Sequence, residues 1–222
     1  LRAHVSRHRI FTEWRDPSIT DESQPHLRHA QLNLYDAANP NQPPYSADFL
    51  EHFAQAQVAR NRRITAWVKE KLAAIRASDS PWSEFAFTVH GTMADPRWLD
   101  PSIEPSDRKA GSCYLGDPKI VNDGPVGLAR FCTLRSWLSQ WSYDDARCDA
   151  IASGGRISVP VLVIGNSADD ACTPSHTQRL YDAVTHEQKH LHVVKGATHY
   201  YTGANGAEHM AEACGVIENF LA

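Results

Sequence analysis

The sequence lacks the features that would assign it to a membrane or nucleic-acid class. No apolar run approaches the roughly 18 residues of a membrane-spanning helix. The N-terminal stretch LRAHVSRHRIF has no apolar core of the kind found in signal peptides. The 22 basic and 26 acidic residues give a net charge of −4, without the basic excess typical of nucleic-acid binding. We therefore expect no membrane and no nucleic-acid partner.

Cysteine is scarce and widely spaced. The five cysteines are odd in number and form no C-x-x-C motif, which argues against a disulfide framework or a zinc knuckle. We expect reduced, mostly buried thiols and a cytoplasmic location. The chain also lacks an initiating methionine. Leu1 is therefore expected to be an internal position of a longer protein, a processed terminus or the start of a truncated reading frame.

The first half of the chain alternates loops with helical patterns. Residues 1–45 are polar and rich in turn signals, and they predict irregular structure. Ser46 is placed to cap a helix over 47–76, and the apolar residues FAFTV at 85–89 predict a short strand. Residues 90–118 form a long loop pattern, which is usually a functional or wrapping segment.

The second half predicts one more helix and then a parallel strand pair. A wide apolar face predicts a helix over 127–142. The apolar runs VPVLVIG (159–165) and HLHVV (190–194) predict strands, and 175–187 predicts a helix between them, capped by Ser175 after Pro174. Strand, helix and strand in this order form a parallel βαβ unit. A closing helix over 207–222 carries on one side Met210, Cys214, Ile217 and Leu221.

Acidic and histidine side chains follow the two predicted strands. Asp169 and Asp170 come after the first strand, and His199 comes after the second, 30 positions beyond Asp169. Since parallel strands end at the same edge of a sheet, an aspartate and His199 are expected to meet there. That pairing is the acid–histidine half of a nucleophile triad.

These two segments resemble the α/β-hydrolase superfamily. PVLVIGNSADDACTP is similar to the family's acid-bearing strand and loop, and KGATHYY is similar to its histidine loop. The resemblance implies that residues 159–222 are the C-terminal part of an α/β-hydrolase core, a parallel βαβ unit plus a closing helix. Residues 1–158 would then be a mainly helical lid or cap with connecting segments, and the core sheet would be incomplete.

The resemblance also implies catalytic roles for Asp169 and His199. The expected activity is hydrolysis of an ester, amide or similar bond in a small-molecule substrate through a nucleophile–His–Asp triad, without a cofactor. His199 would be the general base, and Asp169 would orient it. The alternative is a non-catalytic, degenerate hydrolase-like domain or subunit that binds a ligand or partner.

The family's nucleophile motif, G-x-S-x-G, is absent from the chain. Ser167 follows a predicted strand, but Asp169 stands where the second glycine belongs, and Pro174 interrupts the following helix. The nucleophile is therefore expected outside this chain, in a missing N-terminal half of the same protein or in another chain. This polypeptide alone is expected to be almost inactive.

Two further groups of residues are candidates for a functional role. Trp137, Trp141 and Phe131 could line a substrate pocket, but packing between helices is at least as good an interpretation. His190 and His192 share one face of a strand, with His186 nearby, and such a pair can bind a metal. No further ligand has matching spacing, so no metal is expected.

Overall fold

The computed structural model describes residues 6–79 and 81–222, and it belongs to the mixed α/β class. The chain divides into two compact units that interleave in sequence. The first unit contains Ser6, Arg97–Gly116 and Asp149–Ala222, and the second contains Arg7–Pro96 and Asp117–Cys148. The first unit thus includes part of the predicted long loop and the residues from Asp149 onward. Whether residues 1–158 act as a lid stays a prediction.

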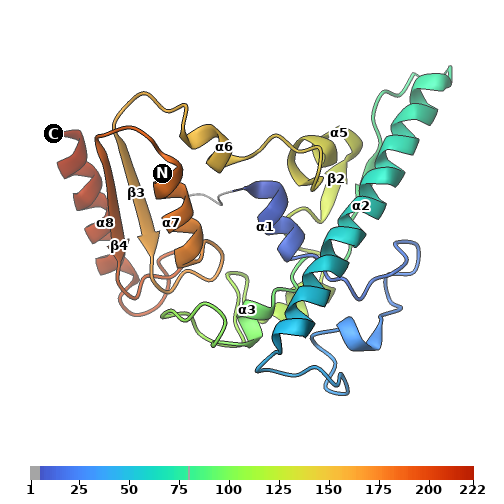
Figure 1. The fold of residues 1–222 in the computed structure, drawn as a ribbon, viewed down its shortest axis with the longest axis horizontal. Helices are drawn as coiled ribbons and strands as arrows, with labels where there is room; N and C mark the ends of the chain where they lie inside the picture. The colour runs from blue at the N-terminus through green and yellow to red at the C-terminus, as the bar shows by residue number, and fades with distance from the viewer. Residues whose placement is uncertain (1–5, 80) are drawn as a thin grey trace. The chain divides into compact units, whose positions relative to one another are not determined.

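The first unit is built on the predicted strand–helix–strand pattern. β3 (Val161–Asn166) and β4 (Lys189–Val194) pair in parallel, with Val161 opposite Lys189. The helix between them is α7 (Pro174–Ala183), and the chain closes with α8 (Gly206–Leu221). α7 and α8 lie on either side of the strand pair (Figure 1). The parallel βαβ unit and its closing helix are confirmed, and α3 (Pro96–Leu99) and α6 (Ala150–Gly154) are short additional helices.

The start of α7 differs from the prediction. The residue at the cap position is Thr173, and Pro174 occupies the first helical turn, where its missing N–H is not needed. Ser175 lies inside the helix. Its backbone N–H donates to Glu104 Oε1 at 2.8 Å. An acidic side chain therefore stabilises the N-terminus of this helix.

Alternate residues of β3 face different helices. Leu162 and Ile164 pack with Val194, Ala197 and Ala213 of the α8 side in one apolar cluster. Gly165 faces α7 so closely that a Cβ there would lie 2.7 Å from Thr177 Cγ2. β3 is therefore buried on both faces, as a parallel strand covered by helices usually is.

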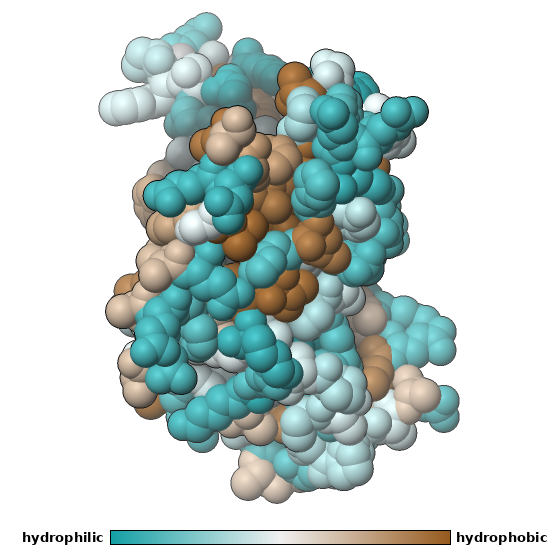
Figure 2. All heavy atoms as spheres, turned by 90° about the vertical axis from the view of Figure 1, so that its left-hand side faces the viewer, coloured by the Kyte–Doolittle hydropathy of each residue, from teal (hydrophilic) through white to brown (hydrophobic). Residues whose placement is uncertain are grey.

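An apolar groove of about 580 Å³ runs along the α8 side of the first unit. It is lined by β3, the segment before it and α8, including Val159, Leu162, Met210, Cys214 and Ile217. Figure 2, which views the side of Figure 1 that carries α8, shows hydrophobic side chains gathered between hydrophilic ones on this face. Leu221, predicted on the same apolar side, is 76% exposed and does not line the groove.

The second unit is organised around one long helix, α2 (Ala47–Ala77), with the predicted cap: Ser46 accepts the Phe49 N–H at 3.2 Å. A short antiparallel pair, β1 (Ala86–Thr88) and β2 (Phe131–Thr133), confirms the strand expected near 85–89. The remaining elements are α1 (Arg7–Glu13), η1 (Ala30–Leu32), α4 (Pro118–Asp123), α5 (Leu134–Ser136) and the π-helical turn η2 (Trp137–Trp141).

Two predictions for this unit were wrong. Residues 127–142 do not form one helix, because Phe131–Thr133 pairs with β1 and Thr133 then caps a new helix by accepting the Ser136 N–H. The first 45 residues are not all irregular either. Arg7–Glu13 is helical, and Ile10 and Phe11 of this helix are buried. The polar residues around them made this segment look irregular in the sequence.

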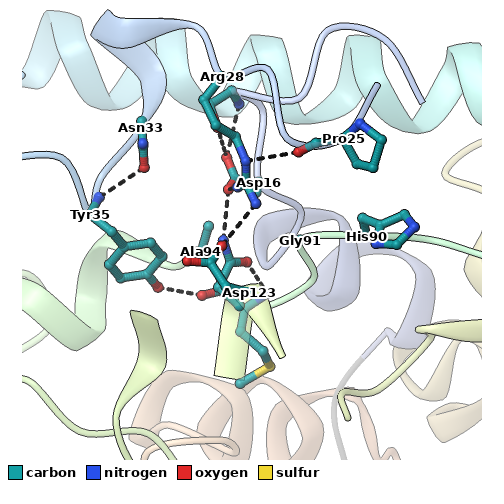
Figure 3. Close-up of polar contacts among 12 residues, drawn as sticks. Asp16, Pro25, Arg28, Asn33, Tyr35, His90, Gly91, Ala94 and Asp123 are labelled. Carbon is teal, nitrogen blue, oxygen red and sulfur yellow. Dashed lines mark hydrogen bonds and ion pairs between the residues drawn. The ribbon is translucent and has the colours of Figure 1, made fainter. Parts of the chain in front are cut away.

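Buried charge ties the N-terminal part of this unit together. The Asp16 carboxylate pairs with Arg28 and also accepts from Asn122 at 2.7 Å (Figure 3). Arg28 further donates to Asp123 at 2.9 Å, and the Tyr35 hydroxyl donates to the Met93 carbonyl. This network borders a polar cavity of about 770 Å³. Arg28, which lines the cavity, already forms ion pairs with Asp16 and Asp123.

The structure shows the five cysteines as free thiols, and Cys148 and Cys214 are exposed rather than buried. Among the residues that the structure describes, no helix combines the length and the apolar character needed to cross a bilayer.

Candidate functional site

Asp169 lies in the loop that leaves the carboxyl end of β3, and it is completely buried. Its Oδ1 accepts the backbone N–H groups of Ala171 at 2.9 Å and Cys172 at 2.7 Å. These bonds turn the loop tightly around the carboxylate and compensate part of its lost hydration. The carboxylate is thus held in one orientation before any partner side chain is considered.

His199 reaches the same place from the end of β4. Gly196 makes the turn after the strand with φ of +74°, a conformation that favours glycine. The two loops are joined by the Ala168 N–H donating to the Ala197 carbonyl at 3.0 Å and by Asn166 Nδ2 donating to the Thr198 carbonyl at 2.7 Å. Both strand ends therefore deliver their loops to one edge, as predicted.

The imidazole and the carboxylate are in direct contact. His199 Nδ1 lies 2.9 Å from Asp169 Oδ1 and 3.2 Å from Oδ2. The His199 side chain is 21% exposed, whereas the Asp169 side chain is 1% exposed. With its Nδ1 proton directed at Asp169, a neutral His199 has Nε2 as its basic nitrogen. The sequence predicted that an aspartate and His199 would meet at this edge, and Asp169 and His199 do meet there. Their catalytic roles stay a prediction.

Aromatic rings surround the imidazole. The Tyr200 ring centroid lies 4.6 Å from that of His199, and the Tyr114 centroid lies 5.6 Å away. Burial raises the pKa of the Tyr114 phenol, with smaller contributions from Cys113, Tyr200 and Asp170, so Tyr114 stays neutral. Tyr200 adjoins His199 in the sequence and could have been noticed. Tyr114 comes from a distant loop, and no local pattern marks it.

Asp170 is set apart from Asp169 by its environment. Burial, and then the charge of Asp169, raise the pKa of Asp170 to about 6. The Asp170 backbone carbonyl accepts the Trp98 indole N–H at 2.7 Å, which fixes the loop from the other side. Of the two adjacent aspartates, Asp169 is therefore the one positioned as the partner of the imidazole.

Ser167 is engaged elsewhere. Its hydroxyl donates to Asp107 Oδ2 at 2.5 Å and accepts the Gly196 N–H at 2.7 Å, and Lys195 pairs with the same aspartate at 2.8 Å. Hydrogen bonds from Lys195 and then Ser167 lower the pKa of Asp107. These contacts give Ser167 a role in joining loops, and the expectation that the nucleophile is another residue stays a prediction.

The strand histidines do not form a cluster. His192 Nε2 lies 2.8 Å from Glu212 Oε1, and the His190 ring packs edge-on against Phe220. His186 Nδ1 accepts the Gln188 N–H at 3.1 Å. Within the described residues, one group of side chains does come close enough to share a metal ion: Asp169, Cys172 and His199, whose ligand atoms lie within 4.8 Å of one another.

The three aromatic candidates for substrate binding lie in the second unit. Trp137 is fully buried, donates its indole N–H to Thr65 Oγ1 at 2.9 Å and stacks under the Arg15 guanidinium. Trp141 packs edge-on against Phe11, whereas Phe131 is 73% exposed on β2. These contacts favour packing for the two tryptophans, and a substrate-binding role for the three residues stays a prediction.

Comparisons with protein-family models, with curated proteins and with solved structures found no match for this chain.

Proposed function

We propose that this chain carries the histidine–aspartate half of a nucleophile–His–Asp hydrolase that acts on an ester, amide or similar bond. His199 is the general base that activates the nucleophile and then the general acid that protonates the leaving group. Asp169 holds the imidazole in the tautomer with the proton on Nδ1 and stabilises the imidazolium formed during reaction. The nucleophile and the oxyanion donors lie outside this chain.

The observation that carries this proposal is the pairing of His199 Nδ1 with a fully buried carboxylate at 2.9 Å. A surface histidine gains little from such a partner, because solvent screens the interaction. Here the acid is anchored by two backbone N–H groups, and the imidazole keeps a partly exposed edge. That combination supports a general base whose Nδ1 is oriented by Asp169 and whose imidazole remains partly accessible to a substrate.

The orientation of His199 is tested by nitrogen NMR of the isotopically labelled chain at a pH where its imidazole is neutral. We expect the Nδ1-protonated tautomer in the native chain and a shift toward the Nε2-protonated tautomer in Asp169→Asn, because the amide can offer its own N–H to the ring. Asp107→Asn is the matched control, since this exposed carboxylate contacts Ser167 and Lys195 and no imidazole. An unchanged His199 tautomer in Asp169→Asn would refute the assigned role of Asp169.

A further inference from the structure

The Cys172 thiol lies beside the His199–Asp169 pair and has no part in the proposed hydrolysis. Cys172 is three residues beyond Asp169 in the same loop, and its backbone N–H donates to the Asp169 carboxylate at 2.7 Å. This turn brings a thiol and a carboxylate together, and His199 arrives from the loop after β4. Carboxylate, thiol and imidazole are the three side-chain types that bind zinc in proteins.

The spacing of these three groups is close to that of a tetrahedral metal site. Zinc lies about 2.0–2.2 Å from nitrogen and oxygen ligands and about 2.3 Å from sulfur, so its ligands are separated by roughly 3.3–3.6 Å. The ligand atoms of the three residues lie within 4.8 Å of one another, and the shortest pair, His199 Nδ1 and Asp169 Oδ1, is 2.9 Å apart. Shifts of about an ångström or less, within the range of side-chain rotation, would bring them to ligand distances.

The surroundings favour a thiolate-binding cation over a hard one. Cys172 and Asp169 are 5% and 0% exposed, so the ligands are shielded from water on the protein side. The side chain of His199 is 21% exposed, which provides an entry path and a fourth position for solvent. Asp169 Oδ1 accepts two backbone N–H groups, and Oδ2 lies 3.2 Å from His199 Nδ1. Sulfur and imidazole ligands select zinc over magnesium or calcium.

We propose that Asp169, Cys172 and His199 form a binding site for a thiophilic divalent cation such as Zn²⁺. Binding forms three metal–ligand bonds and releases the Cys172 thiol proton to solvent. Where the ring bonds through Nδ1, the neutral imidazole keeps its one proton, which moves to Nε2. The ion takes the place of the hydrogen bond between His199 and Asp169. A consequence that rests on the proposed function is that a bound ion inhibits hydrolysis by removing the general base.

No pattern in the sequence predicts this site. Its two loop ligands form a D-x-x-C pattern that is shared by many non-metal loops, and the histidine follows 27 residues after the cysteine. The metal ligands weighed from the sequence were instead the strand histidines, which the fold separates. Only the parallel pairing of β3 and β4 brings the three residues to one edge.

The site is tested on the purified, reduced chain with Co²⁺ as a spectroscopic substitute for zinc. We expect saturable binding with a sulfur-to-cobalt charge-transfer band, which Zn²⁺ abolishes by competition and Mg²⁺ does not. Cys172→Ser should remove the band and weaken Zn²⁺ binding at least about tenfold, or by about 1.4 kcal/mol. Cys113→Ser is the matched control, because Cys113 is equally buried in the same unit and should leave binding unchanged.

A second variant guards against misfolding of Cys172→Ser. His199→Gln changes a partly exposed side chain and should weaken Zn²⁺ binding while leaving the melting temperature close to that of the native chain. A charge-transfer band that persists in Cys172→Ser, or Zn²⁺ binding that is unaffected in both variants, would overturn the site. The tautomer of His199 in the metal-free chain tests the proposed function separately. If His199 is protonated on Nδ1 but the chain binds no Zn²⁺, the metal site is rejected and the proposed hydrolase function is not.

Discussion

Two buried arginines in the second unit have opposite surroundings, although both are fully inaccessible to solvent. Arg60 donates to both oxygens of Glu22 at 2.7 Å and to the backbone carbonyls of Asp16, His90 and Gly91. The guanidinium nitrogens of Arg15 have no hydrogen-bond partner among the described residues. Arg15 stacks over Trp137 at 4.7 Å, and burial, followed by the charge of Arg60, lowers its pKa to about 9.

This contrast predicts opposite effects of the same substitution. Arg15→Met should leave the free energy of unfolding unchanged or raise it by up to about 2 kcal/mol, because an uncompensated buried charge is replaced by an adaptable apolar chain. Arg60→Met should lower it by about 3–5 kcal/mol, because Glu22 loses its bidentate partner and three buried carbonyls lose their donor. Urea unfolding at constant m-value measures both. Greater destabilisation by Arg15→Met than by Arg60→Met would contradict this account.

At the scale of elements, two glycines in the first unit differ in the space available for a larger side chain. At Gly165 in β3, a Cβ would meet Thr177 Cγ2 at 2.7 Å and Thr177 Oγ1 at 3.0 Å. At Gly215 in α8, nothing lies within 4 Å of an added Cβ. The first glycine permits close approach of α7 to β3, whereas the second only weakens a helix.

Gly165→Ala should therefore destabilise the chain by about 1–3 kcal/mol through overpacking. Gly215→Ala should stabilise it by roughly 0.5–1 kcal/mol, because alanine is the better helix former. Thermal unfolding of the two variants, with Gly165→Ala/Thr177→Ala as a partial rescue, measures the difference. Equal melting temperatures for the two single variants would show that α7 and β3 do not pack as described.

The elements that could be predicted are those whose signals are local. α2 and α8 follow from helical spacing, and β3 and β4 follow from apolar runs bounded by turns. β2 was missed because its three residues are fixed by pairing with β1, more than 40 positions away, and not by their own pattern. For the same reason the sequence identified Asp169 and His199 but not Tyr114, whose place beside the imidazole depends on how a distant loop folds back.

At the scale of the whole molecule, the chain divides into two compact units that interleave in sequence. The assignment of residues 1–158 to a lid and of 159–222 to a hydrolase core stays a prediction. Residues 97–116 pack with the unit that contains β3 and β4, through contacts such as Trp98 with Asp170 and Glu104 with Ser175. Such contacts join a side chain to the backbone of a residue about 70 positions away, and they leave no periodic pattern in the sequence. Both described sheets have only two strands, which is few for an independently stable parallel core.

The proposed function makes a whole-molecule prediction. The isolated chain should hydrolyse p-nitrophenyl acetate no faster than a solvent-exposed histidine does, and Ser167→Ala should not change the rate, because the nucleophile is supplied from outside. An in-frame G-x-S-x-G before Leu1 in the coding sequence would support the hydrolase over a non-catalytic binding domain. Turnover that Ser167→Ala abolishes would place the nucleophile within this chain.

The most direct test compares two histidine–carboxylate pairs in the protein expressed from the complete reading frame. His199 pairs with a buried aspartate, whereas His192 pairs with the exposed Glu212 at a similar distance. With a p-nitrophenyl ester as substrate, His199→Ala should lower kcat by about 10³-fold or more, and His192→Ala should leave it unchanged. Full activity in His199→Ala, or equal losses in the two variants, would contradict the assignment of His199 as the catalytic base.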